Sequence, residues 1–166
     1  MSPPKTFSPA PGEGVFRLRI PSIDLEHMVV EGVGTEELQK GPGHYPACGP
    51  GFGRPLCTDF DEIWPGEKGR VVVSGHRTTY GSPFWDLDKL ESGDEIMIET
   101  RWSDQPIVYE VSETKIVSPN SPIVVIPSDR AELALTTCNP KFSAEQRLVV
   151  FAEMQTATAD VNGGRV

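Results

Sequence analysis

Cys138 is the side chain in this sequence that is best suited to covalent chemistry. It stands at the end of an apolar run, in A-L-T-T-C-N-P, and Asn139-Pro140 follows at once, which predicts a thiol where a strand stops. A thiol that attacks a carbonyl group needs a partner for proton transfer and a donor that stabilises the developing oxyanion. The alternative is that Cys138 is a small buried apolar side chain with no chemical role.

Three histidines are available as the partner for proton transfer. His76 follows the apolar run V-V-V-S-G, so it is predicted to lie at a strand end, as Cys138 does. His27 lies in an acidic segment and is predicted to be solvated, whereas His44, in G-P-G-H-Y-P, is predicted to lie in a turn. Arg147 begins the next apolar run, and a hairpin return would bring its guanidinium, which suits an oxyanion, near the thiol. An ion pair of Arg147 with a nearby glutamate fits the local pattern equally well.

The elements that would position these residues are mostly strands. Alternating or β-branched apolar runs predict strands at 15–20, 28–30, 71–73, 94–100, 107–117, 133–137 and 148–154. A brief helix is predicted from Thr35 to Leu38, ended by Gly41. The 16 glycines and 16 prolines indicate many turns. Short strands with few helical windows predict an all-β fold, either a closed barrel or a sandwich.

Charge and hydropathy exclude several classes of partner. The chain has 15 basic and 24 acidic residues, a formal net charge of −9, so it has no basic surplus to displace counterions from nucleic acid or to bind an anionic membrane surface. The longest apolar run, 148–152, is far shorter than the roughly 18 residues of a transmembrane helix. Residues 1–14 are predicted to be a Pro-rich tether and residues 156–166 a flexible C-terminal tail.

Cys48 and Cys57 bracket a Gly- and Pro-rich loop. Three cysteines predict one bridge and one free thiol. A disulfide that closes this loop would stabilise the fold by about 2.7 kcal/mol in the chain-entropy treatment, and it suits an oxidising extracellular site. The alternative is a zinc site shared with His44, although H-x3-C-x8-C matches no common structural zinc spacing. The acidic clusters at 59–62 and 86–88 are predicted to be solvated, so no metal is assigned.

Three stretches together resemble the signature motifs of sortases, the cysteine transpeptidases that attach proteins to the Gram-positive cell wall. They are S-G-H-R-T-T-Y-G (Ser74–Gly81), L-T-T-C-N-P (Leu135–Pro140) and Q-R-L-V-V (Gln146–Val150). The resemblance runs from about residue 16 to 153 and implies a closed β-barrel of about eight strands with short helical turns, with a catalytic domain at 15–155. The H-R-T-T-Y-G form is similar to the class E sortases of actinobacteria. The stretch 47–68 is longer than is usual in the family and is interpreted as an insertion.

The resemblance also assigns roles to residues. It implies that Cys138 is the nucleophile, that His76 donates a proton to the leaving amine, and that Arg147 stabilises the carbonyl oxygen of the substrate. Tyr80 matches the class E tyrosine implicated in choosing Ala over Pro in the signal. Further substrate contacts are expected from Thr79, Thr137 and Asn139. One departure from the family pattern T-L-x-T-C is Ala134, which stands where the first Thr is usual and is expected to affect strand packing more than chemistry.

The implied activity is the cleavage of an L-A-x-T-G or L-P-x-T-G sorting signal, on secreted proteins, between Thr and Gly. The Thr would be held as a thioester and passed to the amine of a peptidoglycan precursor, or to a pilin lysine in pilus-building members, without a cofactor. Sortases are anchored by an N-terminal membrane helix that is absent from this sequence, so we expect a soluble ectodomain at the extracellular face of the membrane. The alternatives are a cysteine peptidase that acts mainly by hydrolysis and a non-catalytic surface barrel.

Overall fold

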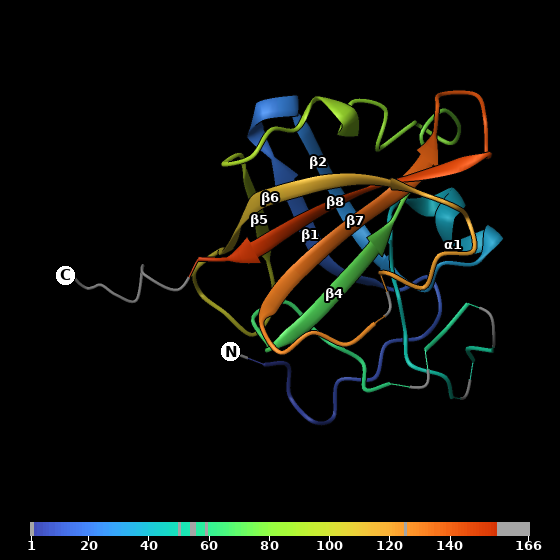
Figure 1. Cartoon of the computed structure of the whole chain (residues 1–166). Helices are drawn as coiled ribbons and strands as arrows, with labels where there is room; N and C mark the ends of the chain where they lie inside the picture. The colour runs from blue at the N-terminus through green and yellow to red at the C-terminus, as the bar shows by residue number, and fades with distance from the viewer. Residues whose placement is uncertain (1, 50, 54–55, 59, 125, 156–166) are drawn as a thin grey trace.

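The computed structural model describes residues 2–49, 51–53, 56–58, 60–124 and 126–155. Within these ranges, eight strands close into one barrel in the order β1-β2-β3-β4-β7-β8-β6-β5 (Figure 1). The closed order confirms the barrel and excludes the sandwich. The elements are β1 (Gly14–Ile20), β2 (Leu25–Glu31), α1 (Thr35–Lys40), β3 (Gly43–His44), β4 (Gly69–Ser74), β5 (Glu95–Glu99), β6 (Ile107–Val117), β7 (Ala131–Asn139) and β8 (Gln146–Met154), with 3-10 turns at Pro21–Ile23 and Leu87–Lys89.

The barrel interior is filled because the long strands alternate between apolar and polar side chains. In β1, Leu18 and Ile20 are fully buried, whereas Arg19 between them points outward and pairs with Glu99 on β5. This period of two is what places one face of a strand in the core and the other in solvent. Tyr109 on β6 is among the largest of the fully buried side chains. The alternation that predicts the strands therefore also determines the core.

Two strands differ from the sequence prediction. The predicted run 28–30 lies in the second half of the longer β2, whose first half shows no apolar run because the polar Glu26 and His27 follow the buried Leu25. The prediction of a turn at His44 is wrong, because His44 lies in β3, which pairs in parallel with β2 and antiparallel with β4. A two-residue strand made of Gly and His has no apolar pattern. Its existence depends on the strands on either side of it.

The pairing of β4, β7 and β8 decides where the candidate site lies. β4 and β7 are parallel neighbours, with Ser74 opposite Thr136, so their C-terminal ends lie at the same end of the barrel (Figure 1). β8 returns antiparallel to β7, with Arg147 directly opposite Cys138. Three segments that are distant in the sequence therefore meet at one end of the barrel.

The N-terminal segment packs against the barrel, although residues 1–14 were expected to form a tether. The ring of Phe7 lies 5.0 Å from that of Trp64 and 5.5 Å from that of Trp102, between ring centroids. The backbone of Gly12 and Glu13 also exchanges hydrogen bonds with Glu31 of β2. A single aromatic residue among prolines is enough to fix such a segment, because aromatic side chains bury a large apolar area. The predicted tail at 156–166 lies outside the described residues.

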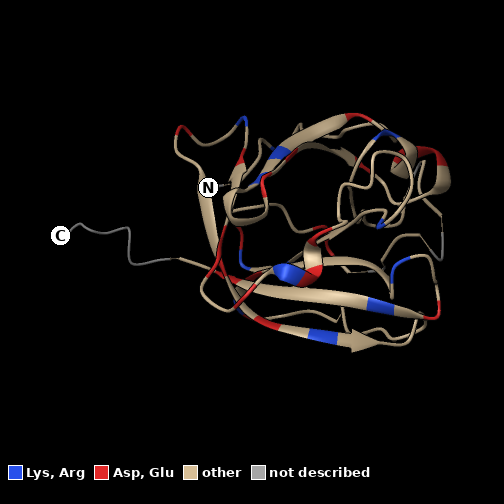
Figure 2. Cartoon of the chain, turned by 90° about the horizontal axis from the view of Figure 1, so that it is seen from above, with Lys and Arg blue, Asp and Glu red and all other residues tan. Residues whose placement is uncertain are grey.

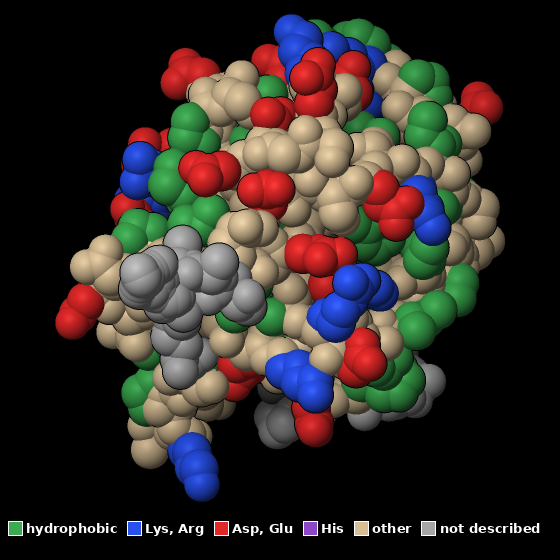
Figure 3. Space-filling view, turned by 60° about the vertical axis from the view of Figure 1, so that its left-hand side comes forward, with side chains coloured by type: hydrophobic (Ala, Val, Ile, Leu, Met, Phe, Trp, Pro, Cys, Tyr) green, Lys and Arg blue, Asp and Glu red, His purple; other side chains and the backbone are tan. Residues whose placement is uncertain are grey.

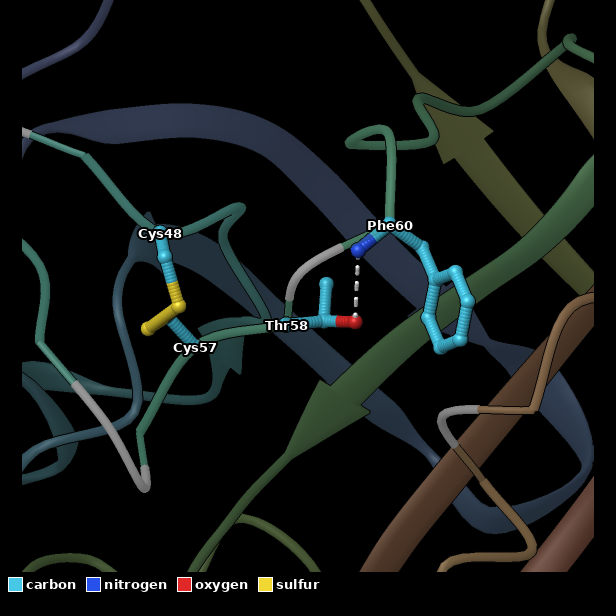
Figure 4. Close-up of a disulfide and its surroundings, with 4 residues drawn as sticks. All are labelled: Cys48, Cys57, Thr58 and Phe60. Atoms are coloured by element: carbon cyan, nitrogen blue, oxygen red, sulfur yellow. Dashed lines mark hydrogen bonds between the residues drawn. A yellow bond between two sulfur atoms is a disulfide. The ribbon is translucent and has the colours of Figure 1, made fainter.

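The segment between β3 and β4 contains the predicted disulfide. Cys48 and Cys57 are bonded, with their Cα atoms 4.9 Å apart, and Cys138 is the free cysteine of the described chain (Figure 4). The bond leaves neither sulfur as a zinc ligand. Thr58 is fixed beside the disulfide, because its N–H donates to the carbonyl of Pro46 and its carbonyl accepts from the N–H of Cys48. Phe60, two residues after Thr58, therefore follows a part of the chain that is held in place.

Acidic and basic residues alternate along the strands and loops of the ribbon in Figure 2, and their side chains are interspersed over the face shown in Figure 3. Several of them form pairs across neighbouring strands, such as Arg17 with Glu26 and Arg19 with Glu99. On the face shown in Figure 3, the acidic side chains do not gather into a single patch. Among the helices of the described residues, none combines the length and the apolar character that crossing a bilayer requires.

Candidate active site

Cys138 lies one residue before the end of β7, and its side chain is partly exposed. Residues that are directly opposite in an antiparallel pair have their side chains on the same face of the sheet, with Cβ atoms about 4.5–5.5 Å apart. Because Arg147 is the direct partner of Cys138, its side chain leaves the same face of the sheet as the thiol, and both residues line one cavity. The hairpin return predicted from the sequence is therefore present.

His76 reaches the same place from the end of β4. The backbone N–H of Gly75 donates to the carbonyl of Thr136 at 3.0 Å, and the hydroxyl of Thr137 donates to the carbonyl of Gly75 at 2.6 Å. These bonds hold the residue before His76 against the residue before Cys138. The imidazole and the thiol consequently border the same two cavities.

The larger of these cavities is a groove of about 600 Å³ that contains all three predicted side chains, His76, Cys138 and Arg147. Its lining includes the end of β6 with residues 118–121 of the loop that follows it, and also Leu38 of α1 and Leu56. The smaller cavity, about 390 Å³, lies between residues 76–79 and 142–144. Cys138 therefore borders an open space on two sides.

The guanidinium of Arg147 is held against the backbone at the end of the β7–β8 loop. Its Nη1 donates to the carbonyls of Ala144 and Gln146, each at 3.0 Å. A guanidinium carries five N–H donors in a planar fork, so these two bonds fix its position and leave further donors. Such a group can stabilise an oxyanion that forms next to Cys138.

The predicted substrate contacts are in different situations. Tyr80 is exposed, has a positive φ of 50° and lies with its ring centroid 5.2 Å from that of His76. Thr79 borders the smaller cavity, and the buried Thr137 borders the groove while its hydroxyl bonds to Gly75. The Asn139 amide instead donates to Gln146 at 3.0 Å. Tyr80 and Thr79 are thus placed near the histidine, whereas Asn139 bonds within the protein.

Arg77 is a residue of the site that the sequence analysis missed. Its side chain is only 4% exposed, and Nη1 donates to the backbone carbonyl of Cys138 itself at 3.0 Å. The other nitrogens donate to the carbonyl of Trp85 at 3.1 Å and to the carboxylate of Asp88 at 3.1 Å. A buried charge is tolerated when it is paired and hydrogen-bonded in this way. The one available signal was its place directly after His76.

A second group of titratable side chains lies outside the groove. His44 Nδ1 is 2.6 Å from Glu31 Oε1 and 3.2 Å from Glu62 Oε2, and its Nε2 is 2.8 Å from the carbonyl oxygen of Ile63. One imidazole with two carboxylates is a set of ligands that metals accept. However, Nε2 donates to a carbonyl and Nδ1 faces two carboxylates, so both nitrogens carry protons in an imidazolium, which cannot ligate a metal. The geometry favours a buried ion pair.

The electrostatics of this group agree with that interpretation. Burial alone would lower the pKa of His44, but the hydrogen bonds and charges of Glu31 and Glu62 outweigh it and raise that pKa to about 10. Burial raises the pKa of Glu31. Burial also acts to raise the pKa of Glu62, but its hydrogen bonds with His44 and Glu31 outweigh this effect and lower it. His44 therefore stays charged at neutral pH and joins Glu62 to the barrel.

We expect the protein to lose stability as pH rises from about 6.5 to about 10. The folded state raises the pKa of His44 from the unfolded value of about 6.5, so this contribution is complete below pH 6.5 and is lost as pH passes 10. The raised pKa of Glu31 acts in the same direction. Thermal unfolding followed by circular dichroism at pH 6, 8 and 10 measures the trend, and the His44→Gln variant should show a flatter one. A melting temperature of the wild type that rises over this range would contradict the prediction.

The chain is similar to known proteins over most of its length. The model of the Sortase domain matches residues 18–155. The chain is 33% identical over 156 residues to Sortase D of Bacillus subtilis, covering 91% of the chain and 69% of that protein. It is 32% identical over 155 residues to Sortase SrtE1 of Streptomyces coelicolor, covering 87% of the chain but only 41% of that protein, so the chain spans less than half of this relative. The crystal structure of Sortase E1 from Streptomyces coelicolor, with a tripeptide in the active site, has a TM-score of 0.70 at 27% identity, covering 93% of this chain and 98% of that one.

Proposed function

The chain belongs to the sortase family of cysteine transpeptidases, and from this membership we propose that it cleaves an L-A-x-T-G or L-P-x-T-G sorting signal between Thr and Gly and transfers the acyl group to an amine of cell-wall peptidoglycan. Sortases act on proteins that bear such signals and are generally associated with the outer face of the Gram-positive cell membrane. We propose that the domain at 15–155 works at that extracellular face, and the disulfide agrees with an oxidising compartment.

The observation that carries this proposal is the convergence of three side chains in one groove. Cys138, at the end of β7, is opposite Arg147 on β8, and His76 comes from the end of the parallel neighbour β4. A nucleophile, a group for proton transfer and a cation beside the reacting carbonyl are what acyl transfer to sulfur requires. This arrangement supports a covalent reaction at Cys138 over the alternative that its thiol only packs within the fold.

The reaction follows from these positions. The thiolate of Cys138 attacks the Thr carbonyl carbon, and the carbonyl oxygen becomes an oxyanion beside the Arg147 guanidinium. The C–N bond to Gly then breaks, with His76 donating its proton to the leaving amine, and a thioester remains on Cys138. An incoming amine loses a proton to His76, attacks the thioester carbonyl, and releases the thiolate of Cys138. Water in place of the amine gives hydrolysis.

Tyr80 is a candidate for setting a preference between Ala and Pro in the signal. We propose that the exposed Tyr80, which lies against His76, contacts the residue that follows Leu in the signal. The resemblance to class E sortases implies that this contact favours Ala over Pro. A comparison of kcat/KM between the two signals for the wild type and for Tyr80→Ala tests this assignment.

One incubation tests the proposed function. The protein is mixed with L-A-x-T-G and L-P-x-T-G peptides, with and without an amine such as triglycine, and the products are read by mass. Transpeptidation predicts a product in which Gly is replaced by the amine and whose yield rises with amine concentration. If only the hydrolysis product forms at every amine concentration, the protein is a cysteine peptidase instead. Intact peptides, together with a Cys138 thiol that resists labelling in the native protein, would favour a non-catalytic barrel.

Arg77 is expected to act as a positioning residue for the nucleophile. Because Arg77 ties the loop that carries His76 to the carbonyl of Cys138, Arg77→Ala should lower kcat by about 10- to 100-fold, since a displacement near 1 Å at a reacting group costs up to that much. The KM for the peptide should change little, because the bonds of Arg77 are to the protein. Arg77→Lys should recover only part of kcat, because an ammonium cannot replace the planar fork. A variant with a lower melting temperature but unchanged kcat at low temperature would limit Arg77 to a structural role.

A further inference from the structure

A second cavity continues the reaction groove away from Cys138. Its volume is about 260 Å³, and its lining includes Thr58 and residues 60–63 on one side and Val124 and residues 126–128 on the other. Tyr45 and Val124 line both this cavity and the groove, so the two spaces share a wall. We call the second space the far cavity, because it lies toward the N-terminal ends of β4 and β7.

The spacing along β7 gives the distance between the far cavity and the thiol. Val72, which lines the far cavity, is opposite Ala134, four residues before Cys138. Arg70, also in the lining, is opposite Glu132, six residues before Cys138. At about 3.3 Å per residue, the far cavity lies roughly 13–20 Å from the thiol along the strand.

An extended substrate has the same spacing. With the Thr of the signal at Cys138, the Leu lies three residues upstream, about 10 Å away. The three residues before the signal then fall at roughly 13–20 Å, which is where the far cavity lies. The larger groove suits this upstream side, because four of the five signal residues precede the cleaved bond.

The walls of the far cavity carry apolar side chains that the fold leaves uncovered. Phe60 is 52% exposed and Ile126 is 50% exposed, and both line the far cavity. Leu56, which is 45% exposed, lines the groove next to it. Large exposed apolar side chains that gather at a hollow are typical of a binding surface, whereas single scattered ones are not.

Both walls are also held in place. Phe60 follows Thr58, whose hydroxyl accepts from the Phe60 N–H at 3.2 Å, and the ring lies on the side of Thr58 away from the disulfide (Figure 4). On the opposite wall, Arg70 Nη1 donates to the carbonyls of Ile123 and Ile126 at 2.8 and 2.9 Å. A restrained cavity binds with a smaller loss of conformational entropy than a loose one.

We propose that the far cavity binds the three substrate residues that immediately precede the sorting signal and that it favours an apolar side chain there, against Phe60 and Ile126. This inference rests on the proposed function, because it takes the groove to hold the signal. The inference gives the disulfide a role in substrate choice, because the bond between Cys48 and Cys57 restrains the part of the chain that precedes Phe60.

The test compares three peptides that share one signal: the signal alone, the signal preceded by Ser-Ser-Ser, and the signal preceded by Ser-Leu-Ser. We expect kcat/KM to be about tenfold higher for the Leu-containing extension than for the all-serine one, the effect of burying one leucine side chain in part. In Phe60→Ser and in Ile126→Ser, the ratio of the two values should fall towards one. Ile116→Ser is the matched control, because Ile116 is equally exposed, at 55%, but lies on β6. Its ratio should stay near ten.

The outcomes separate this inference from the proposed function. Equal kcat/KM for the three peptides in the wild type would overturn the far cavity as a binding site and leave the transpeptidase intact. A tenfold ratio that survives both Phe60→Ser and Ile126→Ser would show that the extension binds elsewhere, and it would also overturn the inference. No processing of any of the three peptides would overturn the proposed function and the inference with it.

Discussion

Replacing Cys138 by alanine is expected to abolish formation of the thioester and to reduce the release of Gly from the signal peptide below detection. No other described cysteine can take its place, because Cys48 and Cys57 are bonded to one another. A methyl group cannot attack a carbonyl carbon, and His76 and Arg147 have no intermediate to act upon without the sulfur. The measurement is the mass of the protein after incubation with the peptide, together with the rate of Gly release.

The Cys138 variant has a built-in control for folding. Cys138 is partly exposed at the end of β7, so the change to alanine removes few core contacts, and the melting temperature should stay close to that of the wild type. Native wild-type protein should also react with a thiol-selective reagent once per chain. A fully folded Cys138→Ala variant that still released Gly would place the reaction at another residue.

Replacing Arg147 by alanine is expected to raise the activation free energy of the reaction by ~2.7–4 kcal/mol. This corresponds to a decrease in kcat of about 10²- to 10³-fold, as for the removal of one oxyanion donor. Arg147 and Cys138 are direct partners across β7 and β8, so their side chains share one face of the sheet and line one groove. Arg147→Lys keeps the charge but not the fork, so it should recover a part of the loss. Single-turnover acylation, followed by mass, measures the step.

The bonds of Arg147 to Ala144 and Gln146 call for a separate measurement of stability. Both bonds are exposed, so their loss should change the melting temperature little. Since exposed hydrogen bonds compete with water, a variant with normal stability and a slow acylation step is the expected combination. An Arg147→Ala protein with near-wild-type kcat would remove Arg147 from the reaction.

The strands of the barrel were predictable because apolar and polar residues alternate along them. In β6, whose predicted range 107–117 is the observed one, the buried residues alternate from Ile107 to Val111. Closure was not predictable from periodicity, because a barrel and a sandwich bury the same alternation of side chains. The short β3 and the packing of Phe7 depend on partners far away in the sequence. No local pattern contains such information.

The residues of the candidate site were also predictable only in part. Cys138, His76 and Arg147 could be named from motifs because each stands where an apolar run begins or ends. Arg77 was missed because its role depends on a carbonyl 61 residues away, and a charged side chain after a strand is usually solvated. His44 was misjudged because its glutamate partners come from β2 and from the segment before β4, and only the fold brings them together.

The direct pairing of Cys138 with Arg147 limits the insertions and deletions that this part of the chain can accept. A one-residue slip in the register of β8 would turn every side chain of that strand to the opposite face, and the guanidinium would leave the thiol. Insertions or deletions between residues 140 and 145 are therefore tolerated only if the turn absorbs them without moving the ladder. Within β8 itself, adding or removing a single codon should inactivate the enzyme even where the barrel survives.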